Sequence, residues 1–289
     1  MKLSDAQLEQ LLELALAAAG RAGEYIRAEA GKPREVMGKQ AGDTLASQVV
    51  TEVDFESQRL ILEVLGESVG AFELGVLTEE GVDDASRHDR DFFWCIDPLD
   101  GTLPFTENVA GYSVSIALVS RAGVPVIGVI QDPVTGHRYH ALLRSGCFRN
   151  GEPLVSGEAR ELTLVMDRSF ANQDGYDRLL DDLRGIAADH GLDGLRIVNQ
   201  GGAAMNACWV IEQAPAVYFK FPKPKRGGGA LWDFAAAACL FGELDGAQVS
   251  DFSGAPLQLN REGDPYMNRD GVVFASSESL WRAVRELRP

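Results

Sequence analysis

Two carboxylates three residues apart, Asp97 and Asp100, stand in the segment DPLDGT directly after the apolar run 92–96. At the carboxyl end of a strand they can converge on one cation, and carboxylate oxygens are hard ligands that suit Mg²⁺ or Mn²⁺. Gly101 lets the backbone approach a ligand closely, and Thr102 can open a helix whose N–H groups could hold a phosphate. An ordinary strand-ending turn with a capping Thr would use the same residues.

Three further segments place carboxylates beside predicted elements. Glu79 and Glu80 follow an apolar segment, Asp233 opens an Ala-rich helix, and Asp54 stands three residues after Thr51. Each has a structural explanation of its own: an exposed acidic pair, an Asp favoured by the helix dipole, and a helix cap. Taken singly, none of the three decides between structure and chemistry.

Together and in this order, the four segments resemble the motifs of the inositol monophosphatase superfamily of Mg²⁺-dependent, lithium-sensitive phosphatases. DPLDGT is highly specific to that group, and the Glu79–Glu80 doublet and the Trp232–Asp233 pair are its other two motifs. The resemblance spans nearly the whole chain. It implies an α/β (α+β) fold, a layered α-β-α-β-α sandwich of the sugar-phosphatase type, with the metal site between the two halves.

The resemblance also implies a role for each matching residue. The residues that would hold metal are Glu79, Asp97, Leu99 through its carbonyl, Asp100 and Asp233. Asp97 would bridge two Mg²⁺ ions, with a third, weaker ion near Glu79, and Mn²⁺ could substitute. The residues with catalytic roles would be Asp54, Thr102 and Glu79, with Asp54 and Thr102 helping to deprotonate the attacking water.

These roles suit one reaction. A phosphate monoester dianion repels hydroxide, so its uncatalysed hydrolysis is extremely slow. Divalent metals neutralise the ester, lower the pKa of a bound water and stabilise the leaving alkoxide. The chain has no Cys-x5-Arg loop, which argues against a covalent phospho-enzyme. We therefore expect a Mg²⁺-dependent phosphomonoesterase that uses a metal-activated water.

Three features resemble the 3'(2'),5'-bisphosphate nucleotidase branch: a glycine turn before a helix, a cation at 220, and the tail 266–273. The segment 220–226 concentrates four cations, which could bind the phosphate that is not hydrolysed. The predicted substrate-binding residues are Gly101, Thr102, Gly201, Gly202, Lys220, Lys225 and Arg226. The expected substrate is adenosine 3',5'-bisphosphate, cleaved at its 3'(2')-phosphate. The alternative substrate is inositol 1-phosphate or a sugar phosphate. The alternative class is a metal-binding regulatory protein. For the segment 220–226, the alternative is a solvated loop with no role in binding.

Composition limits the classes of partner. The 289 residues include 43 Asp and Glu against 27 Lys and Arg, a formal net charge of −16. Binding polymeric DNA or RNA needs neutralising cations, so we expect a small phosphorylated substrate and no nucleic-acid polymer. Apolar runs fall short of the roughly 20 residues of a membrane span, and the first residues do not resemble a signal peptide. The four scattered cysteines predict buried free thiols. We expect a cytoplasmic monomer or homodimer.

Hydrophobic periodicity supplies the elements that must position these residues. In residues 1–150 the pattern predicts helices at 8–26 and 51–65 and strands at 92–96, 113–119, 124–130 and 138–143. This half therefore combines helices with a β-meander, and it carries most of the predicted metal ligands. Residues 151–289 alternate strands at 162–165, 195–198, 216–221 and 272–275 with helices at 176–187, 203–212, 232–241 and 279–287. This second half carries Asp233 and the substrate-side residues.

Overall fold

The computed structural model describes residues 3–32, 37–38 and 49–288. Two large β-sheets organise them. The seven-stranded sheet is an antiparallel meander except for β3, which runs parallel to β4. In order across the sheet its strands are β3 Gly75–Thr78, β4 Phe92–Asp100, β5 Ser113–Ser120, β6 Pro125–Gln131, β7 Arg138–Leu142, β8 Gly146–Arg149 and β9 Glu152–Pro153.

The five-stranded sheet is mixed. Across the sheet its strands are β11 Leu195–Val198, β10 Leu162–Val165, β12 Ala216–Lys220, β14 Val272–Ala275 and β13 Gln248–Ser250. The first three are parallel to one another, and β14 is antiparallel to both β12 and β13. A third, two-stranded sheet pairs β1 Met37–Gly38 with β2 Val49–Val50.

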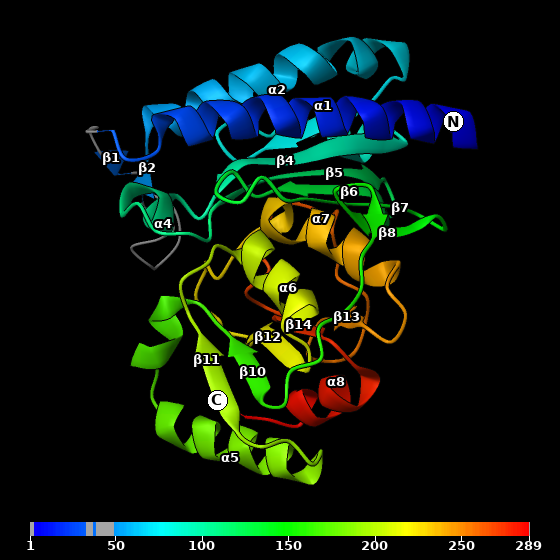
Figure 1. The fold of residues 1–289 in the computed structure, drawn as a ribbon. Helices are drawn as coiled ribbons and strands as arrows, with labels where there is room; N and C mark the ends of the chain where they lie inside the picture. Colours follow the sequence, from blue (N-terminus) through cyan, green and yellow to red (C-terminus); the bar gives the residue numbers. More distant parts are fainter. Residues whose placement is uncertain (1–2, 33–36, 39–48, 289) are drawn as a thin grey trace.

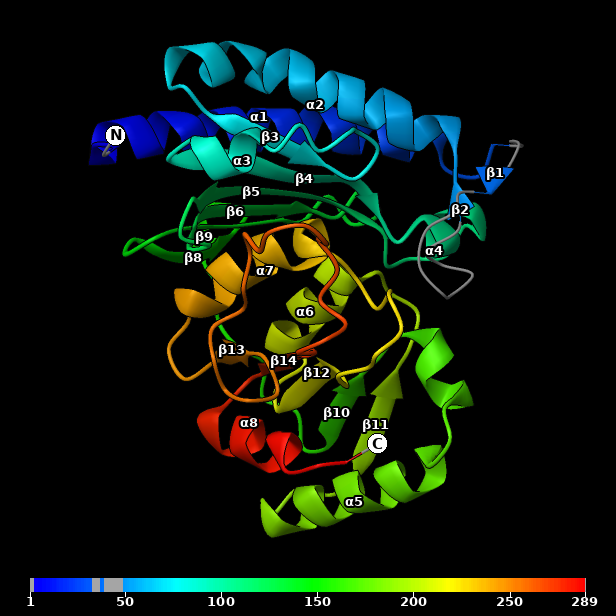
Figure 2. The same cartoon turned by 180° about the vertical axis from the view of Figure 1, so that it is seen from behind.

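Helices separate and cover these sheets, so that five layers follow one another in Figures 1 and 2. The described helices are α1 Asp5–Glu29, α2 Glu52–Ala71, α3 Ser86–Asp89, α4 Thr102–Thr106, α5 Tyr176–Asp189, α6 Ala203–Glu212, α7 Leu231–Gly242 and α8 Glu278–Arg285. From top to bottom of Figure 1 the layers are α1 with α2, the seven-stranded sheet, α6 with α7, the five-stranded sheet, and α5 with α8. The predicted α-β-α-β-α sandwich is confirmed.

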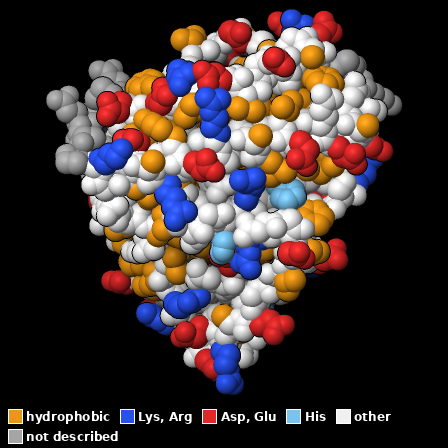
Figure 3. Space-filling model, turned by 45° about the horizontal axis from the view of Figure 1, so that its top comes forward, with side chains coloured by type: hydrophobic (Ala, Val, Ile, Leu, Met, Phe, Trp, Pro, Cys, Tyr) orange, Lys and Arg blue, Asp and Glu red, His pale blue; other side chains and the backbone are white. Residues whose placement is uncertain are grey.

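Burial patterns explain this layering. On β5, Ile116 and its alternate neighbours pack towards α1 and α2, whereas Ala117 and Val119 pack towards α7. Helices α6 and α7 are apolar on nearly every side, as helices between two sheets must be. Helix α7 also approaches β6 closely, which is possible because Gly128 of β6 has no side chain. A Cβ atom at this position would lie only 2.4 Å from the carbonyl oxygen of Ala236 in α7. A surface ion pair, Arg21–Glu63, links the outer helices α1 and α2. On the face in Figure 3, acidic and basic side chains are interspersed.

Most predicted elements lie within a few residues of their observed positions, with three instructive differences. Helix α2 continues to Ala71 beyond the predicted end at 65, because buried Ser68 accepts a hydrogen bond from Trp94 Nε1 (3.0 Å). Strand β4 continues through Asp100. Strands β3, β8, β9 and β13 were not predicted, because each has at most two large apolar side chains, whereas the four-residue strands that were predicted have three.

Four further observations concern the remaining expectations. Residues 39–50 mix small and polar side chains, which predicts a loop or a short extended piece, and this segment lies almost wholly outside the described residues. The division of the chain at residue 150 stays a prediction. All four cysteines are buried and free. Among the described residues, no helix combines the length and the apolar composition that crossing a bilayer would require.

Candidate metal and phosphate site

Asp97 and Asp100 lie at the end of β4, where its pairing with β5 is irregular. Asp97 stands opposite Ser115 and Asp100 opposite Ser113, so β4 has one residue more than β5 over this stretch. Such a bulge re-aims side chains. With Asp233 of α7, the two acids form a group in which one carboxylate oxygen from each residue lies within 4.8 Å of the others. Segments more than 130 residues apart in the sequence thus supply one cluster.

Asp97 is the most buried member of this cluster, with 1% of its surface exposed. Its Oδ1 accepts a hydrogen bond from the Leu99 N–H (3.0 Å). Burial raises the pKa of Asp97 well above 3.8, and the charges of Glu79, Asp100 and Asp233 raise it further. Glu79 is held nearby because its N–H donates to the carbonyl oxygen of Ile96, in the middle of β4 (3.1 Å). Without a cation, ionising Asp97 is therefore costly.

Asp100 joins β4 to the start of α6. Its two carboxylate oxygens accept hydrogen bonds from the N–H groups of Ala203 (3.0 Å) and Ala204 (2.8 Å). Burial and the charge of Asp233 nevertheless raise the pKa of Asp100 to about 8. The carboxylate thus has backbone donors, but they do not compensate for its lost hydration.

Asp233 caps its own helix, since its Oδ2 accepts a hydrogen bond from the Ala230 N–H (2.5 Å). Burial raises the pKa of Asp233, and the nearby Lys220 ammonium offsets part of that effect. Asp233 therefore fits both interpretations of the sequence. One of its oxygens caps α7, and its carboxylate also belongs to the cluster that could bind a metal.

Asp54 also combines two roles. One of its oxygens accepts hydrogen bonds from the Thr51 N–H and hydroxyl, both at 2.8 Å, which completes a capping box for α2. The other oxygen accepts a hydrogen bond from Thr102 Oγ1 (3.0 Å). Burial raises the pKa of Asp54 to about 6, although its hydrogen bonds to Thr51 act in the opposite direction. The predicted Asp54–Thr102 pair is thus present in the structure.

Glycines bring the two loops of the site into contact. Gly101 has φ +81°, and a Cβ there would lie 3.0 Å from the Gly111 carbonyl oxygen and 3.2 Å from the Gly202 nitrogen. Gly202 N–H in turn donates to the Gly111 oxygen (2.7 Å). A Cβ on Gly201 would lie 2.5 Å from Asn206 Oδ1. The loop before α6 therefore lies directly against the DPLDGT loop.

The predicted basic loop divides into two parts. Lys220, at the end of β12, has its ammonium 2.7 Å from Asp167 Oδ2 and close enough to Asp233 to interact with its charge. Arg226 instead pairs with Asp264 (3.4 Å) and lies over the ring of Tyr266 (4.5 Å). Lys225 is exposed. The structure places Lys220 beside the carboxylates, but it gives Lys225 and Arg226 no contact with them among the described residues.

Sequence reasoning missed Asp167 and the residues around it. Asp167 follows β10 by two residues, and β10 is the parallel neighbour of β12, which ends at Lys220. Asp167 Oδ1 accepts hydrogen bonds from Tyr218 Oη (3.1 Å) and Asn206 Nδ2 (3.2 Å). Burial lowers the pKa of Lys220, but the charges of Asp167 and Asp233 outweigh burial and raise it. The sequence did contain one signal for this residue, because Asp167 is an acid that stands just after the predicted strand 162–165.

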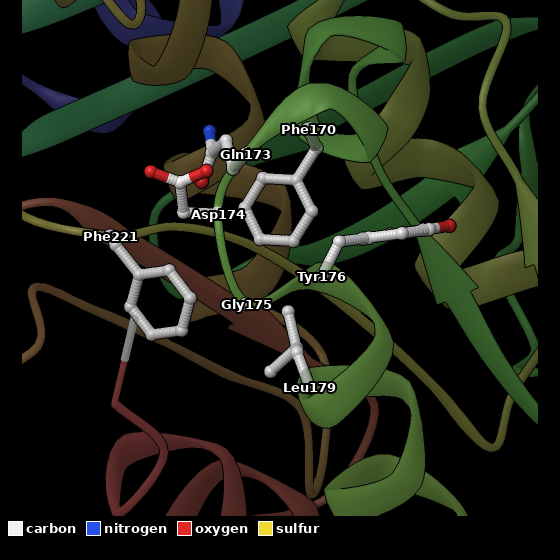
Figure 4. A pocket seen from close by; sticks show the side chains of 7 residues that line it. All are labelled: Phe170, Gln173, Asp174, Gly175, Tyr176, Leu179 and Phe221. Atoms are coloured by element: carbon white, nitrogen blue, oxygen red, sulfur yellow. The ribbon is translucent and has the colours of Figure 1, made fainter.

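A separate small pocket lies on the α5 side of the five-stranded sheet. It is lined by Phe170, Gln173, Asp174, Gly175, Tyr176, Leu179 and Phe221 (Figure 4). The rings of Phe170 and Phe221 stack with centroids 5.9 Å apart. No carboxylate of the cluster lines this pocket, so it is distinct from the candidate site.

The donor set of the cluster fits a hard divalent cation. Asp97, Asp100 and Asp233 offer converging carboxylate oxygens, and Leu99 stands between Asp97 and Asp100 at the end of β4. These are the ligand types of Mg²⁺ and Mn²⁺. The raised pKa values of all three acids have the same cause, burial of negative charge, which a bound cation would relieve.

Known proteins resemble this chain along nearly its whole length. Residues 7–288 match the model of the inositol monophosphatase family. The Nus factor SuhB of Escherichia coli (strain K12) is 29% identical over 283 residues, which cover 97% of each chain. Two solved structures share the fold: an inositol monophosphatase from Anabaena (23% identity, TM-score 0.69, 98% of each chain) and the Thermotoga maritima IMPase (22% identity, TM-score 0.72, 95% of this chain and 96% of that one).

Proposed function

Because the chain belongs to the inositol monophosphatase family, we propose that it is a Mg²⁺-dependent phosphomonoesterase in which an activated water attacks a small phosphate ester. One observation carries the proposal: the buried cluster of Asp97, Asp100 and Asp233, with oxygens within 4.8 Å of one another. Asp97 and Asp100 are buried and Asp233 is partly buried beside them. Without a cation this grouping of negative charge would destabilise the fold, so a role for the three acids in binding metal is the simplest explanation.

Each residue then has a part in the reaction. Asp97, Asp100, Asp233, the Leu99 carbonyl and Glu79 would hold Mg²⁺, which supplies charge neutralisation and a water of lowered pKa. Thr102 donates its hydroxyl hydrogen to Asp54, so its oxygen lone pairs can accept a hydrogen from that water and orient it. Asp54, with a pKa of about 6, is suited to take up a proton near neutral pH. The N–H groups of Gly101 and Thr102 would bind the phosphate.

For the substrate, the geometry favours a phosphorylated polyol such as inositol 1-phosphate or a sugar phosphate. The Asp167 carboxylate is 30% exposed beside the cluster, where it would accept hydrogen bonds from hydroxyl groups. The same negative charge would repel a second phosphate, and the Lys220 ammonium next to it is already paired (2.7 Å). Arg226 is engaged elsewhere, with Asp264 and Tyr266.

Adenosine 3',5'-bisphosphate is the second candidate substrate. Lys220 favours it, because the positive charge of this ammonium acts on both Asp100 and Asp233. Binding the second phosphate there would require Lys220 to exchange Asp167 for the phosphate.

The test measures phosphate release with Mg²⁺ from inositol 1-phosphate and from adenosine 3',5'-bisphosphate. We expect a higher kcat/KM for inositol 1-phosphate, and a loss of more than about a hundredfold in Asp97→Asn with the fold retained. The exposed Asp189 at the end of α5 provides a matched control, Asp189→Asn, which should keep full activity. Faster release from the bisphosphate would select the nucleotidase instead. Release from neither substrate, with metal bound, would indicate a regulatory protein without turnover.

A further inference from the structure

Lys220 is a cation inside an acidic site, and its position is well defined. Its side chain is 17% exposed, and its ammonium lies 2.7 Å from Asp167 Oδ2. The ammonium is also 5.5 Å from the ring centroid of Phe234, the residue that follows Asp233 on α7. Lys220 therefore reaches the cluster from β12 without being one of its ligands.

The charge of Lys220 acts on two proposed metal ligands. Its ammonium lies against the ring of Phe234, the neighbour of Asp233 on α7. Its partner Asp167 accepts a hydrogen bond from Asn206 of α6, the helix whose first N–H groups bind Asp100. An ammonium that attracts these two carboxylates must also repel a divalent cation held between them. Because the site is buried, solvent screens this repulsion less than it would at the surface.

Asp167 is held so that it faces Lys220. Tyr218 and Asn206 both donate to Oδ1 of Asp167, which leaves Oδ2 for the ammonium. Tyr218 and Asn206 are fully buried, and they come from β12 and α6. The Asp167 charge offsets part of the Lys220 charge, so the two residues act on the cluster in opposite directions.

We propose that Lys220 is a positioning residue that weakens the binding of a divalent cation at Asp100 and Asp233, and that Asp167 moderates this effect. The Lys220–Asp167 pair thereby determines how much free Mg²⁺ the protein needs to fill this position. The inference rests on the proposed function, because it requires that the carboxylate cluster bind Mg²⁺.

The experiment titrates the metal-free full chain with Mn²⁺ and follows free Mn²⁺ by its electron paramagnetic resonance signal. Lys220→Met, which keeps the apolar stem, should lower the Kd of the weaker Mn²⁺ site by about tenfold or more. Lys220→Arg keeps the charge and should retain the wild-type Kd. Asp167→Asn should raise the Kd. Damage to packing would instead raise the Kd in both Lys220→Met and Asp167→Asn. A lower Kd in Lys220→Met together with a higher Kd in Asp167→Asn therefore distinguishes an effect of charge from an effect of packing.

A control and a second comparison complete the design. Lys32→Met removes a lysine at the end of α1, paired with Glu29 (2.7 Å), and should leave the Kd unchanged. If Lys220→Met does not fold, Asp167→Asn is compared with Asp167→Asn/Lys220→Met, and the double variant should bind Mn²⁺ more tightly. If a folded Lys220→Met binds Mn²⁺ no more tightly than the wild type, the inference is wrong, while the proposed function stands. The same holds if a folded double variant binds Mn²⁺ no more tightly than Asp167→Asn. Failure of the wild-type chain to bind Mn²⁺ would overturn the proposed function as well.

Discussion

Lowering the pH of the metal-free protein from about 8 to about 5 should stabilise its fold, the reverse of ordinary acid destabilisation. The reason lies in Asp100, whose pKa burial and the charge of Asp233 raise from 3.8 to about 8. Between these two values the folded carboxyl is protonated while the unfolded one is ionised. The folded state therefore binds more protons, and its stability rises as the pH falls.

The magnitude follows from linkage. Each pH unit in this window adds about 1.4 kcal/mol for one such group, so three units add about 4 kcal/mol to the free energy of unfolding. Asp54, with a pKa of about 6, adds to this only in the lower part of the range. Exposed carboxyls with ordinary pKa values contribute little above about pH 5. A domain is stable by only about 5–15 kcal/mol, so the effect is large.

Urea unfolding in the presence of a chelator, followed by circular dichroism at several pH values, measures this free energy. Asp100→Asn should reduce the slope of the pH dependence, because an amide does not titrate, whereas Asp97 and Asp233 still contribute a slope of the same sign. Its absolute stability should fall, since the N–H groups of Ala203 and Ala204 lose an acceptor, so the slope is the quantity to compare. Asp189→Asn should keep the wild-type slope.

Excess Mg²⁺ supplies the complementary measurement. Mg²⁺ binds the ionised carboxylates of the native state, so it should stabilise the protein mainly at the higher pH values and reduce or reverse the gain on acidification. The reasoning is refuted if the metal-free protein has a stability that stays flat or falls between about pH 8 and pH 5, or if Asp100→Asn keeps the slope.

Three further predictions concern single side chains. Thr102→Val removes the hydroxyl that donates to Asp54 and should lower kcat by about a hundredfold or more in steady-state assays with inositol 1-phosphate, whereas Thr102→Ser should retain most of it. Gly201→Ala would place a Cβ 2.5 and 2.6 Å from side-chain atoms of α6, and should cost about 1–3 kcal/mol in urea unfolding. Gly128→Ala, with a Cβ 2.4 Å from a backbone oxygen of α7, should cost a similar amount, about 1–3 kcal/mol. Gly66→Ala in α2, where a Cβ meets open space, serves as the control and should gain about 0.5–1 kcal/mol; equal effects at all three glycines would contradict the packing argument.

Much of the fold could be predicted from periodicity, because its longer elements each bury one continuous face. The alternation around Ile116 in β5 and the stripe of α5 around Leu183 are examples. The errors occurred where a partner elsewhere in the chain decides the structure. The sequence predicted an end for α2 near residue 65, but the helix continues to Ala71, where its Ser68 accepts a hydrogen bond from Trp94. Asp100 does not look like a strand residue, yet its pairing with β5 makes it one.

The candidate site was predictable in its residue types and less so in its surroundings. The segments with Asp54, Asp97, Asp100 and Asp233 are recognisable in one dimension, and the structure brings them together. The count of cations in 220–226 could not reveal that Arg226 turns to Asp264. A count of charges in a segment contains no information on where each side chain points, so phosphate binding by the segment 220–226 stays a prediction.

The sequence by itself determined which acids the chain carries, in what order, and on which elements they stand. Only the tertiary structure decided that the end of β4, the start of α6 and the first turn of α7 meet, because that meeting depends on how two sheets and two buried helices pack. It also decided the energetics of the site. Burial of several negative charges in one place, with Lys220 and Asp167 beside them, is a property of the packed chain and cannot be read from any single segment.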